Sequence, residues 1–399
     1  MKGVQIVEPN KLQIVDLEKP KIDKENNVLV RMVASGICGS DVGIYHGTNA
    51  AATYPRIIGH ENVGIVEEVG EGATKVKVGD RVIIDQVTAC GHCYACRKGR
   101  PNVCGNLKVR GVHIDGGYRE YMAVPDKDCY LVPEMLSDEE AVMIEPTTIA
   151  VQCCSRAELE SEDTVMIIGS GALGSSILRI VKLYNPKAII VTDIDDAKLE
   201  EAKKNGATYT INSLKEDVPA KAHELTDGYG PTVTIDAACV KGSLLTALQA
   251  TGNAGRVITM GFSVAPTEVN QFVITSKELD VRGSRLQNHR FQTVIDLINK
   301  GGVAAMNYSI SDTAEFGEYV SGPRVLPHEE TKARMRAVLA DIQDGTFAGR
   351  WIAENKSRGR TFFNSKRDQL AKHPMEQVGE ELRRNMIWGG DKNLDTASN

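Results

Sequence analysis

The sequence lacks long hydrophobic runs. No stretch approaches the roughly 18 consecutive apolar residues of a membrane-spanning helix, and the opening MKGVQIVEPN has no apolar core of a secretory signal. We therefore expect a cytoplasmic protein. An excess of positive charge is also missing, because 47 lysines and arginines face 53 aspartates and glutamates. This balance disfavours nucleic acid and anionic membrane as main partners.

The remaining composition is that of an ordinary globular protein, with 42% hydrophobic and 25% charged residues over 399 positions. Residues 1–155 hold short segments such as NNVLVRMVAS and GDRVIID between Gly and Asp turns, which predict a β-barrel-type domain. Residues 156–302 alternate strand and helix patterns, which predicts a doubly wound parallel sheet. Residues 303–399 show charged amphipathic helix patterns, so the predicted class is α/β with an extra all-α tail.

Four of the nine cysteines lie close together, in the segment C-G-H-C-Y-A-C-R-K-G-R-P-N-V-C. They are Cys90, Cys93, Cys96 and Cys104. In a reducing cytoplasm such clustering indicates metal binding rather than disulfides. Four thiolates can enclose Zn²⁺ in a tetrahedron, and four protein ligands leave no open position, so the predicted site is structural. The spacing alone leaves an iron–sulfur cluster or free thiols as alternatives.

A glycine motif, G-S-G-A-L-G, follows the apolar segment TVMII and opens a helix pattern. Its glycines are Gly169, Gly171 and Gly174, in the spacing that lets a pyrophosphate approach a helix N-terminus. Asp193 ends the next predicted strand, where a carboxylate accepts hydrogen bonds from ribose hydroxyls and repels a 2′-phosphate. The motif therefore predicts NAD binding, with a glycine-rich turn and a solvated aspartate as the alternative.

A second group of residues has the chemistry of a catalytic metal site. Cys38 lies in G-I-C-G-S-D, His60 and Glu61 in G-H-E-N-V-G, and Glu145 in I-E-P. A thiolate, an imidazole and a carboxylate can hold Zn²⁺ and still leave a position for a substrate oxygen or water. Each residue alone is more often structural, and the nearby four-cysteine segment is what favours a metal.

Together these motifs resemble the zinc-containing medium-chain alcohol dehydrogenase superfamily over residues 1–300. The pattern G-H-E-x-x-G-x-V-x-x-V-G matches residues 59–70, and G-D-R-V follows at 79–82. The segments 111–121 and 283–288 are most similar to the polyol and sugar-acid branch, which includes L-gulonate and L-galactonate 5-dehydrogenases. The resemblance implies a GroES-like catalytic domain, a Rossmann domain and a homodimer or homotetramer.

The resemblance also implies roles for individual residues. Catalytic zinc would be held by Cys38, His60 and either Glu61 or Glu145, and would lower the pKa of an alcohol that passes hydride to NAD. Ser40 would take the hydroxyl proton. Many relatives carry a histidine at the place of Gly43, so the onward proton route differs here. His46 lies nearby in sequence, with an ordinary surface histidine as the alternative.

Two further residues bear on the substrate. Arg285 and His113 would suit an anionic or polyhydroxylated substrate, since an arginine binds two carboxylate oxygens at once. A structural salt bridge or a cofactor contact is the alternative for both.

The tail resembles a different family, because residues 306–325, 341–355 and 379–386 are similar to the C-terminal domain of ketol-acid reductoisomerase. The join falls in 296–302. The upstream acidic helices that hold Mg²⁺ in that family are absent, so a reductoisomerase-related activity is disfavoured. The tail replaces the strand with which medium-chain dehydrogenases normally end. A catalytically impaired fusion or scaffold, with the tail mediating association, is therefore the alternative to an active dehydrogenase.

Overall fold

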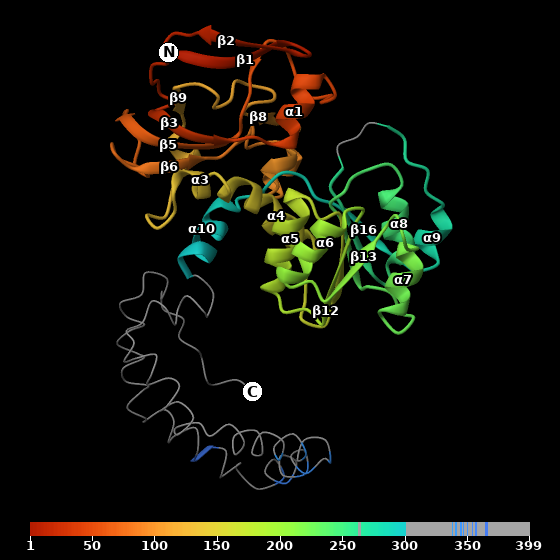
Figure 1. Cartoon of the computed structure of the whole chain (residues 1–399). Helices are drawn as coiled ribbons and strands as arrows, with labels where there is room; N and C mark the ends of the chain where they lie inside the picture. Colours follow the sequence, from red (N-terminus) through yellow and green to blue (C-terminus); the bar gives the residue numbers. More distant parts are fainter. Residues whose placement is uncertain are drawn as a thin grey trace. The chain divides into compact units, whose positions relative to one another are not determined.

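A computed structural model describes residues 1–261 and 265–300, together with isolated positions between 337 and 365. The chain divides into two compact units, Met1–Val303 and Ala304–Asn399. Apart from those isolated positions, the predicted helical tail lies outside the described residues, and the following description concerns the first unit (Figure 1). Among the described helices, none combines the length and the apolar character needed to cross a membrane.

The N-terminal part contains antiparallel sheets, as the alternating segments predict. One sheet has the strand order β2-β1-β4, a second the order β10-β6-β5-β3-β9, and β7 pairs with β8. The strands are β1 (Lys2–Glu8), β2 (Lys11–Asp16), β3 (Val28–Gly36), β4 (Arg56–Ile57), β5 (Glu61–Val69), β6 (Arg81–Ile84), β7 (Val87–Thr88), β8 (Lys108–Val109), β9 (Tyr121–Val124) and β10 (Cys129–Leu131).

Short helices interrupt these sheets, which the strand patterns did not predict. They are α1 (Gly39–His46), α2 (Tyr94–Arg97), η1 (Pro101–Val103), η2 (Asp126–Asp128), α3 (Asp138–Ala141) and the longer α4 (Ile144–Ala157). Helix α1 begins directly after β3, and α4 leads from the sheets toward the second half of the unit. These two helices carry Ser40, Asp41 and Glu145, which belong to the predicted catalytic metal site or its surroundings.

Residues from 164 onward form a six-stranded parallel sheet with the order β13-β12-β11-β14-β15-β16. Its strands are β11 (Thr164–Ile168), β12 (Ala188–Asp193), β13 (Tyr209–Asn212), β14 (Val233–Asp236), β15 (Arg256–Thr259) and β16 (Asp280–Gly283). Its helices are α5 (Ala172–Lys182), α6 (Asp196–Lys204), α7 (Val218–Glu224), α8 (Ser243–Ala250), α9 (Gln271–Thr275) and α10 (Phe291–Lys300). The strand order reverses between β11 and β14, which is where dinucleotides bind in such sheets.

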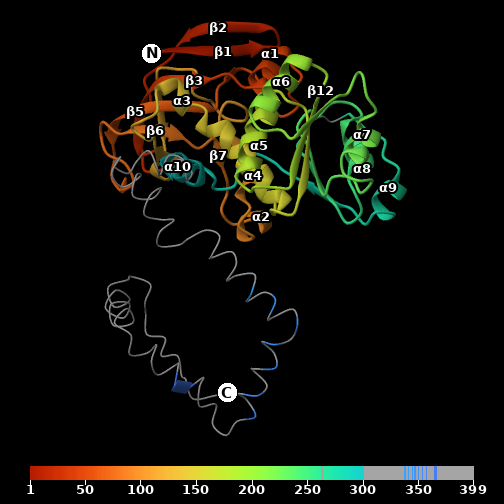
Figure 2. The same cartoon turned by 60° about the horizontal axis from the view of Figure 1, so that its bottom comes forward.

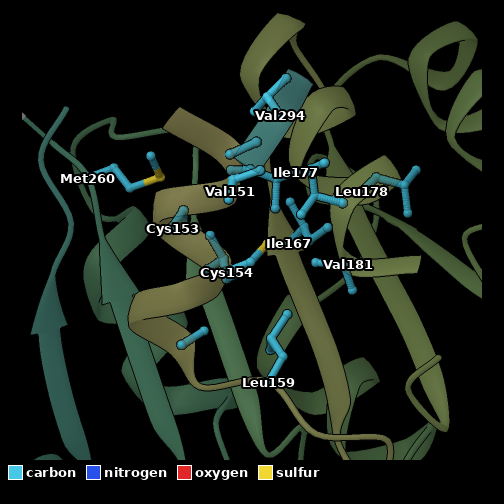
Figure 3. Close-up of a cluster of buried hydrophobic side chains, with 14 of the residues drawn as sticks. Val151, Cys153, Cys154, Leu159, Ile167, Ile177, Leu178, Val181, Met260 and Val294 are labelled. Carbon is cyan, nitrogen blue, oxygen red and sulfur yellow. The ribbon is translucent and has the colours of Figure 1, made fainter. Parts of the chain in front are cut away.

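Apolar side chains cover both faces of the parallel sheet. One buried cluster joins the sheet to α4, α5 and α10, and a separate cluster joins the other face to α7 and α8. Figure 3 shows Val151 and Cys154 of α4 facing Ile167 of β11 and Ile177 of α5. The first cluster also includes Val63 and Ile83 from the antiparallel sheet, so a continuous core fixes one half of the unit against the other.

Helix α4 lies beside α5 in both views (Figure 2). Polar contacts also tie α4 to Arg290, the residue before α10. The Arg290 guanidinium donates to Gln152 Oε1 on α4 at 3.0 Å and to Ser155 Oγ at 2.7 Å. Since Glu145 stands in the first turn of the same helix, the packing of α4 sets the position of that carboxylate.

Candidate catalytic centre and cofactor sites

Strand pairing brings three predicted ligands together. Cys38 lies between β3 and α1, while His60 immediately precedes Glu61, the first residue of β5. Because Gly36 of β3 pairs with Glu61, the chain segments that carry the three side chains meet at one end of the sheet. A Cβ atom on Gly36 would come within 1.9 Å of Glu61 Oε2, so a larger residue there would displace the Glu61 carboxylate. Ligand atoms of Cys38, His60 and Glu61 lie within 4.8 Å of one another.

Asp41 organises this group, although sequence reasoning missed it. Its carboxylate, 2% exposed, accepts hydrogen bonds from the backbone N–H of Cys38 at 2.9 Å and of Gly59 at 3.3 Å. Its Oδ1 lies 3.6 Å from His60 Nδ1. A carboxylate next to an imidazole commonly orients a metal-ligating histidine. The signal available was the acidic residue three positions after Cys38, in the first turn of α1.

The charge balance of the group favours a cation. Burial opposes the charged imidazolium, but Asp41 and Cys38 outweigh it and hold the pKa of His60 well above its usual value. Burial raises the pKa of Glu61, while His60 opposes that rise. Among the described residues, the buried Nδ1 of His60 has no hydrogen-bond partner, since its distance to Asp41 is too long. A thiol, an imidazole and a carboxylate with an unpartnered nitrogen are a donor set that fits Zn²⁺.

Glu145 takes a different position from the other predicted ligands. It is 3% exposed in α4, and it does not belong to the compact group of Cys38, His60 and Glu61. Its Oε1 accepts a short hydrogen bond from Gln86 Nε2. Burial raises the pKa of Glu145 to about 8, with His60 opposing and Glu61 reinforcing the rise.

The residues of the predicted proton route lie on α1. Ser40 is partly buried in its first turn, next to Cys38. His46 is exposed in the last turn, and its Nδ1 lies 3.0 Å from Asn10 Oδ1. The place of Gly43 adjoins Thr48, whose Oγ1 would be 3.4 Å from an added Cβ. The exposed position of His46 and its contact with Asn10 favour the interpretation of His46 as an ordinary surface histidine.

The four-cysteine segment forms a second compact group. The sulfur atoms of Cys93 and Cys96 lie 3.5 Å apart, those of Cys93 and Cys104 3.8 Å, and those of Cys90 and Cys104 3.4 Å. Zn–S bonds of about 2.3 Å in a tetrahedron place sulfurs roughly 3.8 Å apart, so the group fits Zn²⁺. Backbone N–H groups of Cys96 and Gly105 lower the pKa of Cys93 to about 6, whereas burial and neighbouring sulfurs raise the pKa of Cys96 to about 12. Sulfurs crowded in this way need a cation to become thiolates together.

The glycine motif forms the turn between β11 and α5. Gly169 has φ +93°, and a Cβ on Gly174 would lie 1.9 Å from Gly169 O, so these two glycines allow the turn and the close helix packing. Around Gly171, the N-cap of α5, an added Cβ would meet no atom within 4 Å, and no side chain caps the helix. The helix N-terminus is therefore open to a pyrophosphate. Asp193 ends β12 and accepts a 2.7 Å hydrogen bond from Ser170 N, which places its carboxylate beside the loop.

His113 and Arg285 are near one another, although they lie on different halves of the unit. Burial lowers the pKa of His113, and the charges of Arg285 and Arg56 lower it further. His113 Nδ1 accepts from Val109 N at 3.1 Å, and the Arg285 carbonyl accepts from Asn102 Nδ2 at 2.7 Å. Hydrogen bonds therefore fix the ring of His113 and the backbone of Arg285.

Comparison with known proteins agrees with this geometry. The profile of the alcohol dehydrogenase GroES-like domain matches residues 24–134, and the profile of the zinc-binding dehydrogenases matches residues 172–300. The chain is 45% identical to the starvation-sensing protein RspB of Escherichia coli K12 over 302 residues, 75% of this chain and 88% of RspB. It belongs to the zinc-containing medium-chain alcohol dehydrogenase family and is a zinc-type alcohol dehydrogenase-like oxidoreductase.

Other relatives define the wider group. Sorbitol dehydrogenase of Bacillus subtilis 168 is 30% identical over 325 residues, which are 79% of this chain and 92% of that enzyme. The crystal structure of the rspB alcohol dehydrogenase from E. coli CFT073, complexed with the cofactor NADH, superposes with a TM-score of 0.71. The two sequences are 44% identical, and the match covers 75% of this chain and 88% of the chain in that structure.

The tail also has a match. The profile of the ketol-acid reductoisomerase C-terminal domain matches residues 285–388. It overlaps the zinc-binding dehydrogenase profile over residues 285–300, which include most of the predicted join. The resemblance seen in the tail sequence is thereby confirmed at the level of family, and nothing is implied about its activity.

Proposed function

We propose that the protein oxidises a secondary hydroxyl group of a polyol or sugar acid and passes the hydride to NAD. The observation that carries this proposal is the compact group of Cys38, His60 and Glu61, which offers three kinds of ligand. Three protein ligands on a tetrahedral metal would leave one coordination position open. Zinc in this group would lower the pKa of the substrate hydroxyl.

The chain's own residues supply the remaining steps. Ser40, beside Cys38, accepts the hydroxyl proton and passes it to water, since Gly43 offers no imidazole. Asp41 holds the backbone of Cys38 and of Gly59, the residue before His60, through two hydrogen bonds, and its carboxylate stands beside the His60 ring. The glycine loop and the N-terminus of α5 bind the pyrophosphate, and Asp193 binds the ribose hydroxyls of NAD. The four cysteines hold a structural zinc that stabilises the segment containing α2 and η1.

The substrate class follows from Arg285 and His113. Arg285 places a permanent positive charge close to His113, which favours a substrate with a carboxylate over a neutral polyol. In Arg285→Ala, we expect turnover of sugar acids to be lost while turnover of neutral polyols is kept. An equal loss on both would contradict the sugar-acid assignment.

The central experiment is a screen of NAD reduction over sugar acids, polyols and threonine, with and without a metal chelator. We expect turnover with at least one hydroxy compound, and its loss after catalytic zinc is removed. Bound zinc and NAD without turnover on any of them would defeat the proposal. As parts of the same proposal, the protein works in the cytoplasm as a homodimer or homotetramer, with domains at 1–155, 156–302 and 303–399.

A second candidate is a catalytically impaired scaffold whose reductoisomerase-like tail mediates association. The match of residues 285–388 to another family favours it, because that segment stands where relatives continue their own fold. Metal content distinguishes the two hypotheses. Two zinc ions per chain support the dehydrogenase, and a single structural zinc supports the scaffold. Mg²⁺-dependent NADPH turnover of an acetohydroxy acid would instead support a reductoisomerase-related enzyme.

A further inference from the structure

A glutamine that no motif indicated touches the candidate catalytic centre. Gln86 lies in the link between β6 and β7, and its side chain is buried, with the residue 1% exposed. The link is firmly held: the Gln86 carbonyl accepts from Arg110 N at 3.0 Å, and the neighbouring Asp85 carboxylate accepts from Val87 N at 2.8 Å. The amide of Gln86 therefore projects from a fixed base.

The hydrogen bonding of this amide is one-sided. Gln86 Nε2 donates to Glu145 Oε1, while Gln86 Oε1 is buried and has no hydrogen-bond partner among the described residues. A buried primary amide whose oxygen has no hydrogen-bond partner destabilises the folded protein, whereas an apolar side chain of similar size at the same place would not. The bond to Glu145 is thus the one polar interaction that the side chain makes within the described part of the chain.

Hydrogen bonds hold both the backbone and the side chain of Glu145. Its backbone is in the first turn of α4, where its carbonyl accepts from Thr148 Oγ1 at 2.5 Å, and its carboxylate is tied to Gln86. Glu61, in contrast, lies in the compact group with Cys38 and His60, and Glu145 does not. With its Oε1 bonded to Gln86, Glu145 stays outside that group.

We propose that Gln86 is a positioning residue that selects the carboxylate ligand of the catalytic metal, by holding Glu145 outside the ligand set so that Glu61 fills it. The inference rests on the zinc centre of the proposed function. With three protein ligands and Glu145 withheld, the fourth position stays open for the substrate oxygen. Without Gln86, a second carboxylate can reach the metal and occupy that position.

The test is a double-mutant cycle on zinc affinity in the full-length protein. The variants are Gln86→Leu, Glu145→Gln and their combination, with Glu61→Gln alongside. Affinity of the catalytic site is measured by chelator competition, and the ligand set by the visible absorption spectrum of the Co²⁺-substituted protein. Neither readout depends on turnover.

With Gln86 present, we expect Glu61→Gln to weaken zinc binding by about tenfold or more and Glu145→Gln by less than about threefold. In the Gln86→Leu background, Glu145→Gln should weaken binding by about tenfold, because the released carboxylate now binds metal. The Co²⁺ spectrum should change in Gln86→Leu and return toward that of the unmodified protein in the double variant. An equal effect of Glu145→Gln with and without Gln86 would overturn the inference.

Matched controls separate positioning from folding. Gln152→Met removes another buried amide, on α4 itself, whose hydrogen bond goes to Arg290, and it should leave the cycle unchanged. Should Gln86→Leu fail to fold, Gln86→Met, which keeps the length of the side chain, takes its place in the cycle. A wild-type protein that binds one zinc per chain defeats the proposed function, whereas two zinc ions with an additive cycle defeat this inference alone.

Discussion

The Gln287 amide donates a 2.8 Å hydrogen bond to the buried carboxylate of Asp85. The two residues are 202 positions apart and belong to opposite halves of the first unit. Gln287 follows β16 of the parallel sheet, and its own Oε1 accepts from Arg290 N at 2.8 Å. Asp85 adjoins Gln86, so the contact ties the end of the nucleotide-binding sheet to the segment that touches Glu145.

Replacing Asp85 by asparagine should change how stability depends on pH. Burial raises the pKa of Asp85 to about 7, against the opposing hydrogen bond from Val87 N. The folded protein therefore favours the protonated acid, and the wild type loses stability as pH rises from about 4, the unfolded value, to about 7. Asp85→Asn keeps the acceptor for Val87 and Gln287 but cannot ionise, so it should escape this loss.

The measurement is the melting temperature or urea midpoint of both proteins across that range. Relative to wild type, Asp85→Asn should gain stability with rising pH, at up to about 1.4 kcal/mol per pH unit. Asp296→Asn, at an exposed aspartate of α10, serves as the matched control for the loss of one carboxyl group. A constant difference for Asp85→Asn would show that this carboxyl is not the titrating group.

Removing one sulfur from the four-cysteine group should remove one metal ion. Cys93→Ser is expected to lower the zinc content from two to one per chain, because a tetrahedral structural site rarely survives the loss of a thiolate. The segment also contacts the second half of the unit, where Asn102 Nδ2 donates to the Arg285 carbonyl and Asn288 Nδ2 donates to the Gly99 carbonyl. The melting temperature should therefore fall by about 5 °C or more.

Metal analysis and thermal melting check this prediction on the same samples. Cys129→Ser, at a buried cysteine on β10 outside the group, is the control for generic loss of a thiol and should keep both metal ions. Retention of two zinc ions in Cys93→Ser would contradict a structural site at these cysteines.

Local patterns predicted much of the fold. The segments NNVLVRMVAS, GDRVIID and TVMII correspond to β3, β6 and β11, and the glycine motif opens α5 as expected. In contrast, β13 and α9 were not predicted, since Tyr209–Asn212 is short and its pattern mixes exposed and buried residues. Such elements are formed by their neighbours in the sheet more than by their own sequence.

The candidate site was predictable only where the residue types themselves indicate metal binding. Cysteines at short spacing and a His-Glu pair point to metal from sequence alone. Asp41 and Gln86 do not, because an aspartate in a first helical turn and a glutamine after a strand are common on any surface. The roles of Asp41 and Gln86 depend on their neighbours in the folded protein. The pairing of β3 with β5 and the packing of α4 determine those neighbours, and the spacing of residues in the sequence does not reveal them.

Ser40 and His46 on α1 offer a direct test of the proton route. Ser40→Ala should lower kcat by about a hundredfold, because a positioned proton acceptor contributes on that order. His46→Ala should change kcat by less than about twofold, since its ring is exposed and paired with Asn10. Initial rates of NAD reduction on the substrate found in the screen give both values. A large loss in His46→Ala would place the proton route along the other end of the helix.

The choice between NAD and NADP should depend on Asp193 rather than on negative charge in general. Its Oδ1 accepts from Ile194 N at 2.8 Å and Asp195 N at 3.1 Å, and its Oδ2 accepts from Ser170 N. Asp193→Asn can keep the Oδ1 contacts while removing the charge that repels a 2′-phosphate. The ratio of kcat/KM for NAD to that for NADP should then fall by about tenfold or more. Asp195→Asn is the matched control: it lies two residues away, caps α6 through Ala197 N, and asparagine caps helices equally well. An equal fall in Asp195→Asn would mean that the acidic surface as a whole, and not the carboxylate beside the glycine loop, sets the preference.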